Sequence, residues 1–183
     1  GVESGAYRLL GLSDRLAALG PALLFYAIGF VIQGSGEELL VRGYMQSTLA
    51  RACASRAQLW IWAVLVPSLL FALGHAGNPA ITPLALANTA LAGVTLATLV
   101  LQQRSLWAAM GAHAGWNFGV GSIWSLPISG VSTRHLLEVR PAVPLDPVVW
   151  WFGGDYGPEG GFVVTLLYGA LLFFLLRALR ARR

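Results

Sequence analysis

The sequence contains no lysine, only one cysteine and few charged residues of either sign. Its 183 residues include 12 basic ones, all arginine, and 8 acidic ones, so that charged residues make up 11%. Soluble globular proteins carry about 25% charged residues, so this scarcity excludes a disordered chain and argues against a soluble one. The single Cys53 excludes a disulfide framework within the chain and a cysteine-rich metal site. A basic set made of arginine alone is typical of GC-rich prokaryotic genomes.

Apolar residues are what the sequence has in abundance. They make up 56% of the chain, with a mean hydropathy of +0.66, and they form runs near the roughly 20 residues that a helix needs to cross a bilayer. These runs predict an all-α, polytopic transmembrane bundle in one domain, residues 1–183, with Trp residues at the edges of its spans. The five predicted spans cover residues 16–32 (the helix continuing, with a kink at residues 34–36, to about residue 49), 59–75, 81–101, 106–126 and 162–179.

The arginines predict the orientation of the bundle. Residues 51–56, 104 and 177–183 bring seven arginines and no acid to one side, whereas the other side mixes both signs. The positive-inside rule makes the arginine side cytoplasmic, so we expect an integral protein of a prokaryotic cell (inner) membrane with its C-terminus inside. These arginines also explain the basic pI, near 9.8, and no nucleic-acid partner is needed.

Two features of the chain leave alternatives open. The connection 127–161 contains five prolines and cannot be one continuous helix; it is either a solvated loop or a lid over the bundle. The chain begins with Gly and shows no signal peptide, and we expect further spans upstream of it.

Ionisable residues inside the predicted spans are the candidates for function, because each costs about 2.5 kcal/mol or more at a helix centre. In the run Glu37-Glu38-Leu-Leu-Val-Arg42, the i, i+4 spacing allows Glu38 to pair with Arg42. Glu37 is offset by about 100° and lacks that partner. Glu37 is therefore the candidate general base, and Glu38 with Arg42 supports the site.

Two further helical faces carry polar residues. Phe71 lies one turn before His75, and His113 lies one turn before Asn117. A ridge of glycines at residues 111, 115 and 119 predicts packing of that helix against a neighbour, which would turn His113 and Asn117 toward a cavity. A lone Asn88 is best interpreted as a polar contact between helices.

These residues allow two kinds of chemistry. A His-His-Glu metal site from three helices is one, although no two histidines share a helix turn as catalytic zinc sites often require. We favour a mechanism without metal or other cofactor, in which Glu37 and His75 activate a water. His113 and Asn117 would then donate hydrogen bonds to the oxyanion.

Three motifs on successive apolar spans carry a resemblance to a known family. The chain resembles the CPBP family, which comprises CAAX proteases and bacteriocin-processing or bacteriocin-immunity proteins and is also called the ABI family, over roughly residues 20–180. The run Gly157-Pro158-Glu159-Gly160-Gly161 also looks like bacterial members. The motifs read Glu37-Glu38-x-x-x-Arg42, Phe71-x-x-x-His75 and His113-x-x-x-Asn117.

The resemblance implies an intramembrane glutamate protease in an all-helical bundle. In the prenyl-protein branch, such an enzyme removes the last three residues after a lipidated cysteine. Carried over residue by residue, the resemblance implies that Glu37 and His75 activate the attacking water. It assigns the oxyanion to His113 and Asn117, with the neighbouring ion pair supporting the site.

Other functions remain open at this point. The polar cluster could only fix helix packing in a non-catalytic immunity or scaffold protein, or it could form a proton path in a transporter. The expected partners of a protease are the bilayer and a membrane-associated peptide or protein, with lipidation undecided. Counting along the helices places Glu37 nearer the cytoplasmic side than His75, so they can meet only if a span tilts or kinks or the predicted boundaries are shifted.

Overall fold

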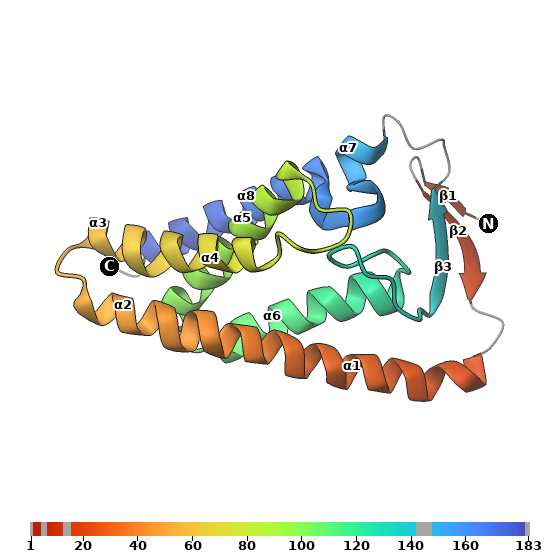
Figure 1. The fold of residues 1–183 in the computed structure, drawn as a ribbon, viewed down its shortest axis with the longest axis horizontal. Helices are drawn as coiled ribbons and strands as arrows, with labels where there is room; N and C mark the ends of the chain where they lie inside the picture. Colours follow the sequence, from red (N-terminus) through yellow and green to blue (C-terminus); the bar gives the residue numbers. More distant parts are fainter. Residues whose placement is uncertain (1, 5–6, 13–15, 142–147, 182–183) are drawn as a thin grey trace.

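The computed structural model describes residues 2–4, 7–12, 16–141 and 148–181. Long helices form an elongated bundle, and a small sheet lies at one end of it (Figure 1). The connection between α2 and α3 and the end of α8 lie at the opposite end of the bundle, as the arginine pattern predicts. Two arginines of the predicted cytoplasmic tail, Arg182 and Arg183, lie outside the described residues.

The first span is one continuous helical rod of three segments. It consists of α1 (Leu16–Glu38), a π-helical segment η1 (Leu39–Gln46) and α2 (Ser47–Ala52). Helix α1 continues through both glycines of residues 34–36, so the predicted kink does not interrupt it. The irregularity comes instead directly after Glu38, where the wider π turns begin. Such π segments are frequent at functional sites, and this one carries Arg42.

The second span returns after a short capped turn. The Ser55 side chain accepts from the backbone N–H of Gln58 and forms a capping box that starts α3 (Arg56–Gln58). The helix continues through the π segment η2 (Leu59–Leu65) into α4 (Val66–Gly74), and His75 is its C-terminal cap residue.

The third span is a regular helix with conventional ends. Thr82 caps α5 (Pro83–Gln103) through the backbone N–H of Ala85, and Pro83 occupies the first helical position, where its missing N–H costs nothing. At the other end Arg104 adopts a left-handed conformation with φ of 53°, which stops the helix.

The predicted fourth span is helical but shorter than expected. It comprises the 11 residues of α6 (Trp107–Asn117) and the 6 residues of the π segment η3 (Phe118–Ile123). It ends before residue 126 because the backbone turns left-handed at Ser125, with φ of 54°. The prediction of five full-length spans is therefore corrected. Four helices within the described residues are long and apolar enough to cross a membrane: Leu19–Ala52, Arg56–Gly74, Pro83–Gln103 and Phe162–Ala181.

The connection between η3 and the last helix is folded rather than open. It contains a strand β3 (Leu137–Pro141), a short helix α7 (Val148–Phe152) and two 3-10 turns, η4 (Gly154–Tyr156) and η5 (Pro158–Gly160), before α8 (Phe162–Ala181). Strand β3 pairs antiparallel with β2 (Tyr7–Leu12), which pairs antiparallel with β1 (Val2–Ser4). The sequence analysis did not predict this sheet.

The helices pack in a way that differs from the glycine prediction. Helix α5 packs against both α4 and α8, and α1 packs against α6. A Cβ atom at Gly111, Gly115 or Gly119 would meet nothing within 4 Å, so the predicted ridge contacts no described helix. The close approach of α1 to α6 uses Gly34 instead, where a Cβ would lie 3.3 Å from the backbone nitrogen of Ala114.

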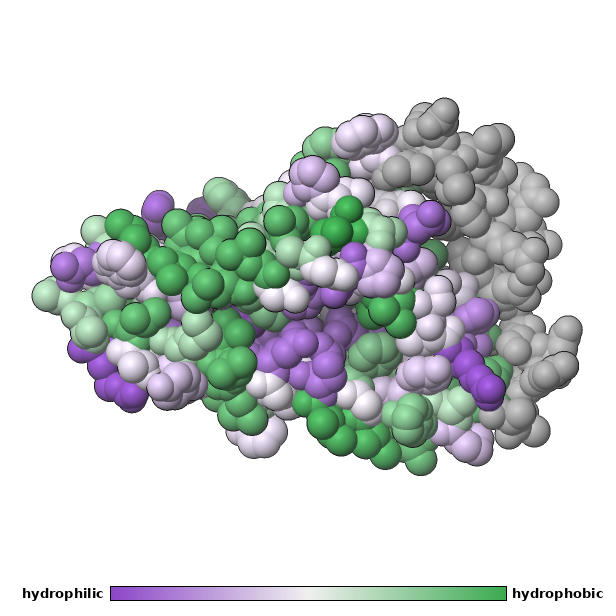
Figure 2. All heavy atoms as spheres, in the orientation of Figure 1, coloured by the Kyte–Doolittle hydropathy of each residue, from purple (hydrophilic) through white to green (hydrophobic). Residues whose placement is uncertain are grey.

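The outer surface of the bundle is apolar. Large hydrophobic side chains are exposed on α1, α4 and α8, among them Phe25 (72%), Leu73 (60%) and Phe174 (65%). Figure 2 shows hydrophobic residues over the helices, with a hydrophilic hollow between them. This arrangement suits contact with lipid on the outside and a polar site inside, and it is that of an integral membrane protein with the predicted all-α, polytopic fold.

Candidate active site

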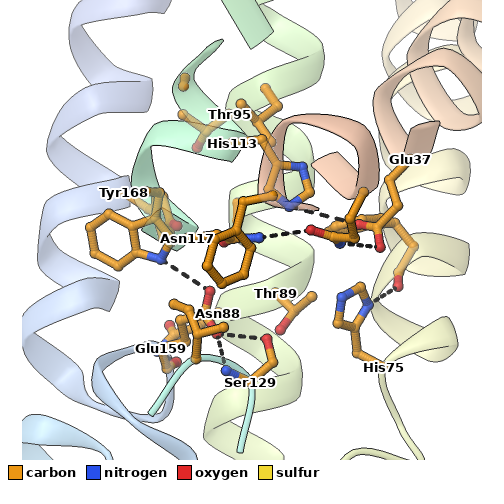
Figure 3. A pocket seen from close by; sticks show the side chains of 18 of the residues that line it. Glu37, His75, Asn88, Thr89, Thr95, His113, Asn117, Ser129, Glu159 and Tyr168 are labelled. Carbon is orange, nitrogen blue, oxygen red and sulfur yellow. Dashed lines mark hydrogen bonds and ion pairs between the residues drawn. The ribbon is translucent and has the colours of Figure 1, made fainter. Parts of the chain in front are cut away.

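A cavity of about 780 Å³ lies among α1, α4, α5, α6, α8 and the 127–161 connection. The four residues predicted to be catalytic all line it: Glu37 from α1, His75 from the end of α4, and His113 and Asn117 from α6 (Figure 3). The structure therefore brings residues from three separate spans into one space. Counted from the α2–α3 turn, Glu37 and His75 differ in depth by about one helical turn, a difference small enough for both side chains to line the same cavity.

The predicted ion pair of Glu38 with Arg42 is present and deeply buried. Arg42 Nη1 donates to Glu38 Oε1 at 2.8 Å, and both side chains have 0% exposure. Arg42 Nη2 also donates to the carbonyl oxygen of Gly93 at 3.1 Å, and the guanidinium lies 4.7 Å from the centre of the Phe71 ring. The arginine thus joins α1–η1, α5 and α4 at the base of the site.

His113 contacts both glutamates. Its Nδ1 lies 2.9 Å from Glu38 Oε1, and its Nε2 lies 3.7 Å from Glu37 Oε2. A carboxylate can only accept, so Nδ1–H donates to Glu38 and Nε2 faces Glu37. Glu38 therefore does more than pair with Arg42, because it also fixes the orientation of the His113 ring.

His75 occupies the same cavity but makes a different contact from the one expected. Its Nδ1 donates to the carbonyl oxygen of Phe71 at 2.8 Å, and its ring lies 4.7 Å from the Phe71 ring. In a neutral imidazole this bond leaves Nε2 as an acceptor. No hydrogen bond or ion pair joins the described side chains of Glu37 and His75; the histidine nearest to Glu37 is His113.

Gln33 is a site residue that the sequence analysis missed. Its Nε2 donates to Glu37 Oε1 at 2.5 Å, and its Oε1 accepts from Asn117 Nδ2 at 3.1 Å. Gln33 therefore links the predicted base to the predicted oxyanion donor. The other carboxylate oxygen, Glu37 Oε2, is buried and accepts no hydrogen bond from the part of the chain that the structure describes. The i, i+4 spacing of Gln33 and Glu37 on an apolar span is the sequence feature that could have identified it.

The 127–161 connection forms a wall of the cavity and carries a second polar cluster. Glu159 Oε1 accepts from Trp116 Nε1 at 3.1 Å, while Oε2 accepts from the backbone nitrogen and hydroxyl of Ser129 at 2.9 and 2.7 Å. Ile128, Ser129 and Glu159 all line the cavity. Of the two interpretations of this connection, the structure supports an element that covers the bundle.

Asn88 holds helices together, as interpreted from the sequence. Its Nδ2 donates to the carbonyl oxygens of Glu159 and Gly161 at 2.8 and 3.0 Å, and its Oδ1 accepts from the Thr165 hydroxyl at 2.7 Å. It therefore fixes α5 to the start of α8 and is not a partner of His113 or Asn117. The described residues contain no group of three or more His, Cys, Asp or Glu side chains that could hold a metal ion.

Comparison with known proteins identifies the family of the chain. Residues 19–119, more than half of the chain, match the family described as Rce1-like, type II CAAX prenyl endopeptidase. The chain belongs to this family. No curated protein and no solved structure matches it. The resemblance to CAAX proteases drawn from the three motifs is thereby confirmed at the level of the family.

The matched segment of this Rce1-like protein contains every predicted site residue from Glu37 to Asn117. It ends before η3 is complete, so the 127–161 connection and α8 lie beyond it. In general terms the chain is a CAAX-type membrane protease. The catalytic assignments rest on the geometry of the cavity.

Proposed function

We propose that the protein is a membrane-embedded endopeptidase in which a water activated by glutamate and histidine attacks a peptide bond without a metal ion. The observation that carries the proposal is that one cavity holds two acceptor atoms available to a water, together with side-chain donors available to an oxyanion. Glu37 Oε2 accepts no hydrogen bond from the described residues, and His75 Nε2 is left as an acceptor by the bond that Nδ1 makes to Phe71. A general base needs such a free acceptor within reach of the water.

The reaction can be written with these groups. Glu37 takes a proton from the water, held with the help of His75, as the oxygen attacks the carbonyl carbon. The C–N bond then breaks as the same proton passes to the departing amine. His113 donates to the oxyanion through Nε2, which requires an imidazolium because Nδ1–H already donates to Glu38.

Asn117 can supply the second oxyanion donor. One of its two amide hydrogens is used by Gln33, and the other is available to the cavity. The link through Gln33 also fixes the amide with Oδ1 turned away from Gln33. Preorganised donors of this kind stabilise charge that develops only in the transition state.

The walls of the cavity support a membrane-associated peptide as the substrate. Leu96, Leu99, Leu171 and Leu175 line the part contributed by α5 and α8, and apolar walls favour apolar or lipidated peptide segments. A peptide ending in a lipidated CAAX-like motif is the substrate class we propose. The prokaryotic inner membrane and the cytoplasmic C-terminus remain predictions from the arginine pattern.

Cleavage by the purified protein tests the proposal. In the first assay, the protein in proteoliposomes receives an internally quenched peptide with a farnesylated CAAX end. In the second, we compare the membrane proteomes of cells that carry the wild-type protein with those of cells that carry Glu37→Gln. We expect processing by the wild type and none by Glu37→Gln, because the amide keeps the shape but cannot take the proton. Asp155→Asn, an exposed carboxylate outside the cavity lining, is the matched control and should cleave normally. Equal processing by wild type and Glu37→Gln would contradict the proposal.

A further inference from the structure

The Glu159 cluster lies across the cavity from Glu37 (Figure 3) and has no part in the mechanism above. Its carboxylate binds two different segments of the chain, namely α6 through Trp116 and the start of the 127–161 connection through Ser129. Three donors share the two oxygens, so the carboxylate is well supplied with hydrogen bonds. Glu159 itself follows Pro158 in the η5 turn, directly before α8. The cluster therefore fixes α6 relative to the beginning of α8.

Trp116 connects this cluster to the proposed catalytic groups. It stands three residues after His113 and directly before Asn117 on α6, so any rotation of the helix moves all three side chains together. Its ring also packs on Tyr168 of α8, with 5.9 Å between the ring centres. The indole nitrogen of Trp116 donates to Glu159, whereas Figure 3 shows the side chains of His113 and Asn117 directed toward the side of the cavity that carries Glu37.

Polar side-chain contacts hold α6 on two sides, and α6 also packs against α5. On the α1 side, His113 is bound by Glu38 and Asn117 by Gln33. On the α8 side, the polar contact is the bond from Trp116 to Glu159. Gly111, Gly115 and Gly119 give α6 no close contact through a third face. The rotation of α6 therefore depends on both sets of contacts.

We propose that Glu159 is a positioning residue for the hydrolytic reaction. It holds Trp116 and so fixes the rotation of α6 that presents His113 and Asn117 to the substrate carbonyl. This inference rests on the proposed function, in which those two residues stabilise the oxyanion. Misplacement of catalytic groups by about 1 Å can cost about 10²-fold in rate, so a small rotation of α6 is enough to matter.

Glu159→Gln isolates the contact. A glutamine has one acceptor oxygen where the carboxylate has two. If that oxygen faces the N–H and hydroxyl of Ser129, the amide nitrogen faces the indole N–H of Trp116, and two donors oppose each other. The opposite orientation would leave the Ser129 N–H without an acceptor. The variant must therefore lose a hydrogen bond either to Trp116 or to Ser129. We expect it to lose the bond to Trp116, because one bond is made there and two are made to Ser129.

The experiment measures kcat, KM and Tm of wild type, Glu159→Gln and Trp116→Phe with the same quenched peptide. We expect both variants to lower kcat by about tenfold or more while KM stays within about twofold, because the donors act on the transition state. The double variant should be no slower than the worse single one, since both remove the same bond. Asp155→Asn is the control for a carboxylate-to-amide change nearby.

A second measurement does not depend on turnover. The protein contains seven tryptophans, so labelling with 5-fluorotryptophan gives resolvable ¹⁹F resonances, and Trp116→Phe identifies the one from Trp116. Glu159→Gln should shift that resonance, and Asp155→Asn should leave it in place. If Glu159 only stabilised the fold, Tm would fall while kcat per folded molecule stayed normal, which would overturn the inference.

The outcomes separate this inference from the proposed function. Inactive Glu37→Gln together with a normal kcat in Glu159→Gln would overturn the role of Glu159 alone. Wild-type protein without any Glu37-dependent cleavage would overturn both. A shifted Trp116 resonance with a lowered kcat and an unchanged Tm would support the inference. If Glu159→Gln does not fold, Trp116→Phe alone decides, because it removes the donor and keeps an aromatic ring against Tyr168.

Discussion

Replacement of Arg42 by methionine should destabilise the bundle strongly. The guanidinium is the cationic partner of Glu38, both side chains are fully buried, and methionine is an unbranched side chain without charge. Removing one half of a buried ion pair costs about 3–5 kcal/mol, because the remaining charge is left without compensation. The loss of the bond to the Gly93 carbonyl lies within this estimate and is not added to it.

The same reasoning predicts that a second substitution restores part of the stability. In Glu38→Gln/Arg42→Met the buried charge is gone, and the amide oxygen introduced by Glu38→Gln can still accept from His113 Nδ1. The double variant should therefore be more stable than Arg42→Met alone, with a coupling energy of about 1–3 kcal/mol. Both variants should lose activity, because Arg42 holds Glu38, the acceptor that orients the His113 ring.

Unfolding by SDS in mixed micelles, followed by far-UV circular dichroism, measures the free energy of unfolding of each variant. Arg51→Met is the matched control, because Arg51 is exposed and, among the described residues, its side chain donates one hydrogen bond, to Thr48 Oγ1, so its loss should cost less than about 0.5 kcal/mol. An Arg42→Met protein within about 1 kcal/mol of wild type would refute the argument. The argument would also be refuted if the changes in the free energy of unfolding from Glu38→Gln and Arg42→Met simply added in the double variant.

Three further predictions concern turnover. Gly34→Ala should lower kcat by about tenfold, since its Cβ would lie 3.4 Å from His113 Cγ and push α6 away, whereas Gly36→Ala, with nothing within 4 Å, should cleave at the wild-type rate. Asn117→Ala should lower kcat by about 10²–10³-fold with little change in KM or Tm; a lower Tm with a normal kcat would make Asn117 a packing residue. EDTA or phenanthroline should leave the rate unchanged, because the described residues offer no group of three metal ligands; activity lost to the chelator and restored by zinc would contradict this.

Interactions within one helix could be predicted from the sequence. The Glu38–Arg42 pair and the shared faces of Phe71 with His75 and of His113 with Asn117 follow from the i, i+4 geometry of a helix, whatever surrounds it. The apolar runs likewise predict the helices, because their length is set by the bilayer.

Interactions between helices could not be predicted in the same way. Which histidine lies beside Glu37 depends on the depth and rotation of α4 and α6, and a single sequence fixes neither. The glycine ridge on α6 is a motif of helix contacts, yet the close approach of α1 to α6 occurs at Gly34 of α1. Both helices carry glycines, and the sequence does not show which of them lie at the contact. Glu159 lies in a connection whose path could not be derived from its prolines.

The short fourth helix has a consequence for the surrounding bilayer. Its 17 residues from Trp107 to Ile123 extend about 25 Å at most, against about 30 Å of hydrocarbon. Lipid beside a helix of this length must thin locally, or polar groups must enter the acyl-chain region. His113 and Asn117 stand on this helix, so we expect such thinning to bring water closer to the groups that need it. Hydrolysis consumes one water per bond, and a bilayer thinned at α6 would ease the supply of that water.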